Sequence, residues 1–363
     1  SLPDPVQGIA NLFGLGNDVQ TKAAGDEETI VDNSTVASWL NLELDKDTKN
    51  VGRIWTDKTV SNTDITLSKI DSDETRTIKK APGSDFLTVL SALSSTSNTS
   101  TTTTVPLDIV LVLDASGSMD DPMGSGDSTK RINALQTAAN SFIDKIAEQN
   151  ASIADSSKQH QVSVVKFAGN KSNSVGNDTY KNGGYTYNYS QVMVSLSVCT
   201  NATKSNFTSM INAIRPAGAT QADYGMELAS SQLNSSAART DSKKVVLFFT
   251  DGAPTSSSGF EGNVASSAVS FAKGMKDNGT TIYSIGIFAG ADPNANPTIS
   301  GTSNENKFMQ AVSSNYPSAT YTQSGGLWPT WTWNFGARAE NSDFYKAASS
   351  ADQLSKIFDD ISS

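Results

Sequence analysis

Five oxygen-bearing side chains from three separate places in the sequence could together bind one divalent cation: Asp114, Ser116, Ser118, Thr220 and Asp251. The first three alternate along the chain, and side chains two residues apart in an extended segment point to the same side. Carboxylate and hydroxyl oxygens suit Mg²⁺, with Mn²⁺ next, whereas zinc sites are built from His and Cys. Two carboxylates balance the charge of a dication and the hydroxyls add none, so the ion would keep an open position. A carboxylate of another molecule could fill that position.

Calcium ranks behind both of these ions because the loop that begins at Asp114 does not follow the EF-hand pattern. The sixth residue of the loop is Met119, where an EF-hand has Gly, and the twelfth is Ser125, where an EF-hand has a bidentate Glu. A calcium cage would also contain more carboxylates than two.

Residues 106–363 alternate between apolar runs of strand length and amphipathic helical segments. Strands are expected at 107–113, 161–168, 192–198, 244–251, 280–288 and 343–347, and helices at 130–149, 204–214, 221–238, 261–277, 304–314 and 351–362. Near-continuous apolar strands separated by helices are typical of a doubly wound, mostly parallel α/β sheet that is covered on both faces. If these strands, numbered along the chain, follow the common order 3-2-1-4-5-6, the winding reverses between the first strand, 107–113, and the fourth, 244–251. Ligands of such sheets bind beyond the carboxyl ends of the strands at the point of reversal. This order places Asp114 beside Asp251.

Residues 1–105 differ from the rest and predict a smaller, β-rich accessory region. Short β-like runs at 39–44, 51–60 and 64–70 are separated by Asp, Asn and Ser turns. The Ser- and Thr-rich stretch at 91–105 has the composition of a linker. Its run of threonines equally suits an exposed strand leading into the next domain, which is the interpretation that we favour.

The composition excludes several classes of partner. The chain has 363 residues and a formal net charge of −10, whereas binding to nucleic acid or to an anionic membrane needs a basic surface. No apolar run reaches the roughly 18 residues of a membrane span. Cys199 is the only cysteine, so no intrachain disulfide can form. An exported bacterial protein does not need one, and we expect an extracellular location.

Two aromatic-rich insertions interrupt the α/β pattern, at about 171–191 and 318–341. The first predicts a hairpin around Asn182-Gly183, with Tyr185, Tyr187 and Tyr189 on one face. We expect this hairpin to pack on the flank of the domain, although a tyrosine-rich ribbon could also be a recognition surface. The second insertion contains Trp328, Trp331, Trp333 and Phe335. We expect its indoles to dock on residues 1–105, with a separate small core or a ligand grip as alternatives.

The segments "DASGS", "GAT" and "FFTDG" resemble the metal-ion-dependent adhesion site of von Willebrand factor A domains. The pattern of that family is Asp-x-Ser-x-Ser followed by a distant Thr and a distant Asp, and it falls on the five residues named above. The resemblance covers about 106–363, with insertions. It implies that the serines and the threonine bind the ion directly or through water, and that the aspartates often act through water. The stretches 51–60 and 85–95 are similar to the segment that precedes the A domain in Gram-positive surface and pilus-tip adhesins.

The leading hypothesis is a non-enzymatic adhesin on the cell surface, at the cell wall or pilus tip. It would use Mg²⁺ to bind a carboxylate of a host or extracellular-matrix protein, and other pilus subunits are further candidate partners. The first alternative is a structural pilus or cell-wall subunit whose ion only stabilises the fold. The second is a metal-dependent hydrolase, which would need a base near the ion. His160, the only histidine, opens the strand at 161–168 and so lies at the opposite edge of the sheet from Asp114, which argues against a Ser-His-Asp triad.

Overall fold

A computed structural model describes residues 54–68, 73, 75–80, 82–83, 85–94 and 105–362. The chain divides into two compact units, and the described residues before 95 belong to one of them while those from 105 onward belong to the other. The strand expected at 39–44 and the whole run of threonines at 101–104 lie outside the described residues. In the part of the chain that the structure describes, every helix is too short or too polar to cross a membrane.

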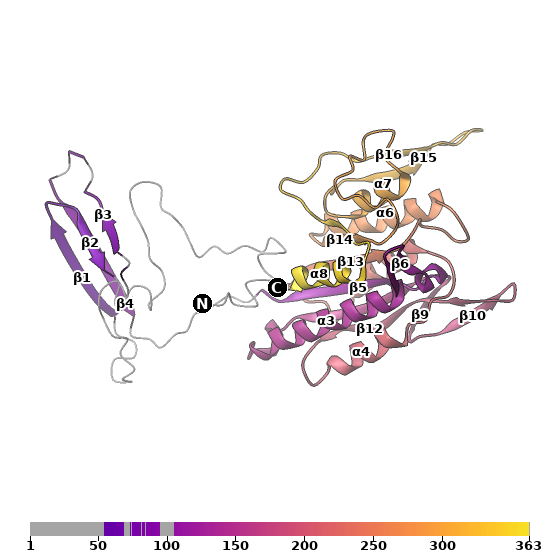
Figure 1. Ribbon diagram of the computed structural model, residues 1–363, viewed down its shortest axis with the longest axis horizontal. Coiled ribbons are helices and arrows are strands. Elements are labelled where there is room, and N and C mark those ends of the chain that lie inside the picture. Colours follow the sequence, from indigo (N-terminus) through magenta and orange to yellow (C-terminus); the bar gives the residue numbers. More distant parts are fainter. Residues whose placement is uncertain are drawn as a thin grey trace. The chain divides into compact units, whose positions relative to one another are not determined.

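In its described residues, the N-terminal unit contains two antiparallel pairs of strands (Figure 1). β1 (Ile54–Ser61) pairs with β4 (Leu87–Ser94), and β2 (Ile65–Ser68) pairs with β3 (Thr75–Ile78). Each pair is a separate two-stranded sheet. The prediction of a β-rich region is therefore confirmed for the part of it that the structure describes.

The larger unit is built on a seven-stranded sheet of order β17-β14-β13-β5-β8-β12-β9. Its strands are β5 (Leu107–Asp114), β8 (Gln161–Phe167), β9 (Lys171–Val175), β12 (Ser190–Val198), β13 (Lys243–Thr250), β14 (Thr281–Gly286) and β17 (Tyr345–Ala347). Six of them are the strands expected from the sequence, in the expected order. β12 runs antiparallel to β8, and β9 adds a parallel edge strand beyond it. The doubly wound, mostly parallel α/β fold is confirmed.

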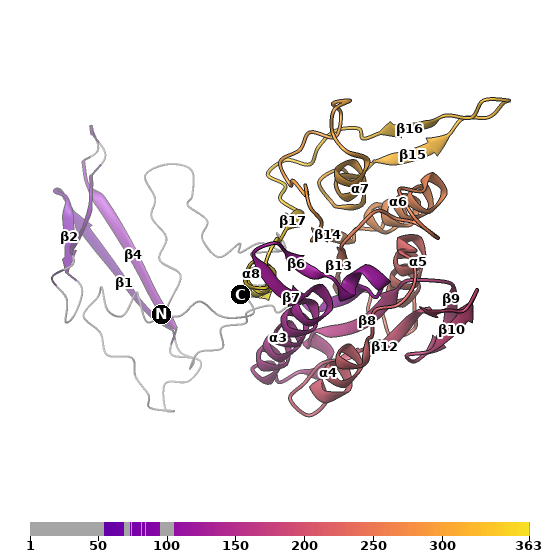
Figure 2. The same ribbon diagram turned by 45° about the vertical axis from the view of Figure 1, so that its right-hand side comes forward.

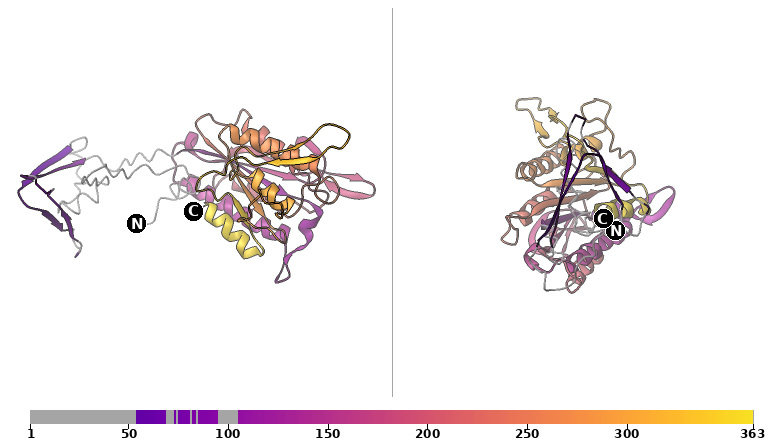
Figure 3. Two further views of the ribbon diagram at one scale, coloured as in Figure 1. Left: turned by 90° about the horizontal axis from the view of Figure 1, so that it is seen from above. Right: turned by 90° about the vertical axis from the view of Figure 1, so that its left-hand side faces the viewer.

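Helices cover both faces of this sheet, which explains why β5 is buried along its whole length. α3 (Arg131–Ala151), α4 (Lys204–Ala213) and α8 (Ala351–Ser362) lie on one face, and α5 (Ala222–Leu233), α6 (Gly262–Asp277) and α7 (Asn304–Val312) lie on the other (Figure 2). In Figure 3 the yellow α8 and the orange α6 are seen on opposite sides of the sheet. A hydrophobic core lies on each face of the sheet, and alternate residues of β5 point into one or the other. Leu111 faces α3 and Val112 faces α5.

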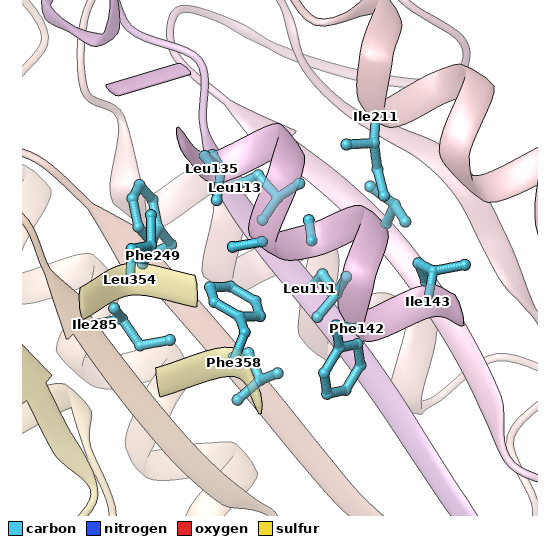
Figure 4. Close-up of a cluster of buried hydrophobic side chains, with 14 of the residues drawn as sticks. Leu111, Leu113, Leu135, Phe142, Ile143, Ile211, Phe249, Ile285, Leu354 and Phe358 are labelled. Carbon is cyan, nitrogen blue, oxygen red and sulfur yellow. The ribbon is translucent and has the colours of Figure 1, made fainter. Parts of the chain in front are cut away.

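The core under α3 and α8 fixes the start of α3, and with it one side of the candidate site. Phe142 of α3 and Phe358 of α8 meet edge to face, with ring centroids 6.1 Å apart (Figure 4). Leu111 and Leu113 of β5 lie in the same cluster. Because β5 ends at Asp114 and α3 packs on the same strand, the loop between them is held at both ends.

Three antiparallel hairpins extend beyond the sheet. They are β6 (Pro122–Gly124) with β7 (Asp127–Lys130), β10 (Thr179–Asn182) with β11 (Tyr185–Asn188), and β15 (Thr320–Gln323) with β16 (Trp331–Asn334). The last two project from the same end of the unit, away from the end of α8 (Figures 1 and 2).

The tyrosine-rich hairpin differs from the prediction in the residues that form its turn. Asn182 pairs with Tyr185, so the turn is formed by two glycines, Gly183 and Gly184, both with positive φ. Tyr187 and Tyr189 pack on Tyr180, with ring centroids 5.4 and 4.5 Å apart, respectively. Tyr185 lies next to the turn and is 73% exposed, so this packing involves only Tyr187 and Tyr189 of the three tyrosines.

The tryptophan-rich insertion forms a small aromatic core within its own unit. Tyr321 of β15 stacks on Trp331 and contacts Trp333, with ring centroids 5.0 and 3.9 Å apart, respectively. Trp331 also lies against the backbone of Gly262 at the start of α6, where no side chain intervenes. These two indoles therefore belong to a separate small core, which was one of the alternatives, while their docking on residues 1–105 stays a prediction. Trp328 is instead 88% exposed.

Candidate metal centre

Asp114 joins the ends of the two strands that meet at the reversal of the sheet. It is the last residue of β5 and is fully buried. Its Oδ2 accepts hydrogen bonds from Thr250 Oγ1 at 3.0 Å and from the backbone N–H of Asp251 at 3.2 Å. Its Oδ1 accepts a bond from the backbone N–H of Ser116 at 2.8 Å. The carboxylate thus fixes the end of β13 and the first turn of the loop that follows β5.

The two serines are brought together by a turn rather than by an extended segment. A 3₁₀ helix, η2 (Gly117–Asp120), begins directly after Ser116, so the expected alternation of side chains does not continue through this loop. The hydroxyl oxygens of Ser116 and Ser118 nevertheless lie 3.1 Å apart. The expectation of extended geometry is wrong, and the turn supplies the proximity instead.

Asp251 completes a compact group of oxygen atoms. Its Oδ1 accepts hydrogen bonds from Ser118 Oγ at 3.0 Å and from Ser116 Oγ at 3.5 Å. Its Oδ2 forms an ion pair with Arg131 Nη1 at 2.9 Å. Arg131 is not among the residues predicted from the sequence. The available signal was a basic side chain as the first residue of a helix, where the helix dipole favours acidic ones.

Thr220 reaches the same edge of the sheet through its backbone. Gly218 O accepts a hydrogen bond from Gly117 N at 3.0 Å. This bond ties the loop that contains Thr220 (215–220, the threonine loop) to the loop that contains Ser116 and Ser118 (115–118, the serine loop). Gly218 has φ +108, a conformation that favours glycine, and a Cβ there would lie 2.9 Å from Tyr187 Cδ1. Thr220 itself pairs with Thr255 through both backbone groups and is buried. All three predicted segments therefore meet at one edge.

The charge arrangement fits a hard dication. Burial, and then the neighbouring carboxylate of Asp251, raise the pKa of Asp114 well above its usual range. A cation between the two carboxylates would remove this repulsion. Among the described residues, no three His, Cys, Asp or Glu side chains gather as a metal-binding group. A cation here would therefore be held by a mixed set of hydroxyls and carboxylates, which suits Mg²⁺ or Mn²⁺.

A buried lysine that was not predicted as part of the site links the tyrosine-rich hairpin to both loops of this centre. Lys166 Nζ donates to three oxygens: Asn177 Oδ1 at 2.8 Å, Asn188 Oδ1 at 3.0 Å and the Asp178 carbonyl at 3.2 Å. Asn188 Nδ2 in turn donates to the carbonyls of Ala115 at 3.0 Å, Arg215 at 2.6 Å and Ala217 at 3.2 Å. Burial lowers the pKa of Lys166 to about 8. Asn188 therefore satisfies carbonyls on both sides of the centre.

The other two reactive side chains considered from the sequence lie away from this edge. His160 Nδ1 accepts a hydrogen bond from the backbone N–H of Leu107, at the opposite end of β5 from Asp114, and burial lowers the pKa of His160 to about 4. Cys199 is fully buried, and burial raises the pKa of its thiol to about 12. Neither residue lies near the two serines.

Comparison with known proteins identifies the family of the larger unit. The sequence model of one protein family, the von Willebrand factor type A domain, matches residues 108–322. The chain belongs to the von Willebrand factor type A domain family. A search of curated proteins finds no match for this von Willebrand factor A protein.

Several solved structures are similar to this A domain. The pilus adhesin SpaC from Lactobacillus rhamnosus GG is 21% identical, with a TM-score of 0.46 over 71% of this chain and 30% of SpaC. The PilB minor pilin from Streptococcus sanguinis is 14% identical, with a TM-score of 0.47 over 85% of this chain and 77% of PilB. The vWF domain of the type V pili tip protein Mfa5 from Porphyromonas gingivalis is 13% identical, with a TM-score of 0.43 over 71% of this chain and 94% of that domain. The chain thus spans less than a third of SpaC.

Proposed function

We propose that this A domain is a metal-dependent adhesion module of the cell surface, which binds a carboxylate of a host or extracellular-matrix protein. The observation that supports it best is the grouping of Ser116, Ser118 and Asp251 oxygens within 3.5 Å of one another. This group lies beside the buried Asp114, at the point of the sheet where ligands of doubly wound folds bind.

In this proposal Ser116, Ser118 and Thr220 supply hydroxyl oxygens to the ion, and Asp114 and Asp251 supply charge. Mg²⁺ is the proposed ion, with Mn²⁺ as the substitute and Ca²⁺ behind both, because the set contains only two carboxylates. When bound, the ion would offer positive charge to an outside carboxylate. Ser118 is exposed, so its face of the group is open to a partner.

The metal site is tested by isothermal titration of Mg²⁺ and Mn²⁺ into the wild type, Ser118→Ala and Asp121→Asn. Ser118→Ala removes one proposed ligand from an exposed loop, and we expect the affinity to fall at least about tenfold, which corresponds to about 1.4 kcal/mol. Asp121→Asn removes a neighbouring charge outside the proposed set, and its affinity should stay within about twofold of the wild type. Equal affinities for the wild type and Ser118→Ala would refute the assignment.

The adhesion step is tested by binding of the wild type to immobilised extracellular-matrix proteins in Mg²⁺, in EDTA and after Mg²⁺ is restored. The proposal expects binding that is lost in EDTA and regained with Mg²⁺. Metal-induced stabilisation without any metal-dependent binding would favour the alternative, a structural pilus or cell-wall subunit. Turnover of phosphate or peptide substrates would favour a hydrolase.

A further inference from the structure

Arg131 places a fixed positive charge against the candidate metal centre. Its Nη1 lies 2.9 Å from Asp251 Oδ2, and the side chains of the two residues are 19% and 0% exposed, respectively. The backbone of Arg131 is held as well, because its N–H donates to Asp121 O at 2.9 Å where the loop enters α3. The guanidinium is therefore part of the centre and not a mobile surface group.

This charge alters the balance of the centre. With both carboxylates ionised, which is the form that binds a cation, Asp114 and Asp251 carry two negative charges and Arg131 cancels one. A dication would then leave the centre with a net charge of plus one, whereas without Arg131 the loaded centre would be neutral. Charges a few ångströms apart at a partly buried site are only weakly screened by solvent, so a difference of one unit of charge changes the affinity for the ion.

We infer that Arg131 weakens the binding of the free cation and couples it to the binding of an anion, so that metal and carboxylate bind cooperatively. This inference rests on the proposed function and assigns to Arg131 the coupling between the ion and the carboxylate. Arg131 withholds one oxygen of Asp251 from the ion and repels the cation, and an incoming carboxylate neutralises the excess charge. Because coupling between two ligands is reciprocal, each must raise the affinity for the other by the same factor.

The neighbouring residue provides a matched control. Lys130 carries the same charge one position earlier and pairs with Asp120 at 2.9 Å, but both side chains are more than half exposed. Solvent screens such a pair, so its effect on a buried centre should be small. Lys130→Gln therefore removes the same charge as Arg131→Gln from almost the same place in the chain, without removing a contact to Asp251.

The experiment measures Mn²⁺ binding by electron paramagnetic resonance in the wild type, Arg131→Gln and Lys130→Gln, each with and without acetate. We expect Arg131→Gln to bind Mn²⁺ at least about tenfold more tightly without acetate and to lose most of the acetate effect, with Lys130→Gln within about twofold of the wild type. Thermal unfolding in EDTA checks that each variant is folded. Equal or weaker Mn²⁺ affinity of a folded Arg131→Gln overturns the inference.

The wild type alone provides a second test that does not depend on any variant. Acetate should raise its affinity for Mn²⁺, and Mn²⁺ should raise its affinity for acetate by the same factor. Absence of this coupling in a wild type that binds Mn²⁺ overturns the inference but leaves the proposed metal site intact. A wild type that binds no Mn²⁺ refutes the proposed function itself.

Discussion

Lys166 donates a hydrogen bond through its buried ammonium to Asn188 Oδ1 at 3.0 Å, and this pair connects β8 to both loops of the candidate metal centre. Asn188 passes the connection on, because its Nδ2 reaches Ala115 in the serine loop and Ala217 in the threonine loop. A buried carbonyl that loses its donor costs free energy. The relative placement of the two loops therefore depends on a side chain that is not a candidate ligand.

Asn188→Ala should accordingly weaken divalent-metal binding without removing a ligand. We expect the free energy of unfolding to fall by about 2 kcal/mol, since Lys166 and the loop carbonyls lose partners, and the affinity for Mg²⁺ to fall as the loops separate. Asn177→Ala is the matched control. It also removes an acceptor of Lys166, but Asn177 Nδ2 donates only to Ala213 O, outside both loops. Isothermal titration should find the Mg²⁺ affinity of Asn177→Ala near that of the wild type, and equal losses in both variants would contradict this account.

The sheet and the meeting of Asp114 with Asp251 could be predicted because both follow from local pattern and a general rule. Apolar runs mark β5 and β13, and the reversal of a doubly wound sheet places their carboxyl ends side by side. The path of the serine loop could not be predicted, because the 3₁₀ turn after Ser116 depends on hydrogen bonds that Asp114 accepts from the loop itself and from the distant strand β13.

Arg131 and Lys166 show why the rest of the centre was missed. Each acts on a residue far away in the sequence, Asp251 and Asn188 respectively, so no local pattern specifies the pair. Lys166 nevertheless left a signal, since a charged residue within an apolar strand that is buried on both faces must find partners. The packing of Trp331 on α6 could not be predicted for a related reason. The bare backbone of Gly262 accommodates Trp331, and that fit depends on the tertiary fold.

The partly buried Trp331 and the exposed Trp328 of the second insertion should contribute very differently to stability. Trp331→Ala removes an indole that stacks on Tyr321 and packs against α6, and we expect the free energy of unfolding to fall by about 2 kcal/mol because the side chain is partly buried. Trp328→Ala removes the same side chain from an exposed position, so the change should stay within about 0.5 kcal/mol. Chemical denaturation of both variants provides the measurement. A large loss for Trp328→Ala would mean that this indole packs on a surface of its own.

His160 should make the stability of the fold depend on pH. Burial lowers the pKa of His160 to about 4 in the folded protein, whereas the pKa in the unfolded chain is about 6.5. The unfolded chain therefore binds the proton more readily, so the stabilisation is present above about pH 6.5 and is lost as the pH falls towards 4. The loss approaches about 3 kcal/mol, given 1.36 kcal/mol for each pKa unit.

Denaturation of metal-free wild type and His160→Gln at a series of pH values isolates this contribution. Other groups titrate in the same window, including Asp223, whose pKa burial raises to about 6. Their effects are common to both proteins, so the difference in the free energy of unfolding reports His160. That difference should shrink as the pH falls from 6.5 to 4. A constant difference would show that His160 accepts a proton as readily in the folded protein as in the unfolded chain.

A second buried aspartate at the opposite end of β5 should be important for stability and not for metal binding. Asp108 accepts hydrogen bonds from Arg239 Nη2 at 2.8 Å and from Ser242 Oγ at 2.6 Å, and Lys244 lies 3.4 Å away. Burial opposes ionisation of Asp108, but these hydrogen bonds, with those from the Arg239 backbone and Gln161, lower its pKa. The carboxylate is thus ionised and fully paired in the folded protein.

Asp108→Asn should lower the free energy of unfolding by about 3 kcal/mol, because it leaves Arg239 partly buried without its counter-charge. Its Mg²⁺ affinity should equal that of the wild type, since the full length of β5 separates Asp108 from the candidate centre. Ser118→Ala should show the converse, with near-normal stability in EDTA and weakened Mg²⁺ binding. Asp241→Asn, at an exposed pair with Lys158 on the same edge as Asp108, should change neither quantity. If Asp108→Asn weakened Mg²⁺ binding while remaining folded, the two ends of β5 would be coupled, and the separation of stability from metal binding would have to be abandoned.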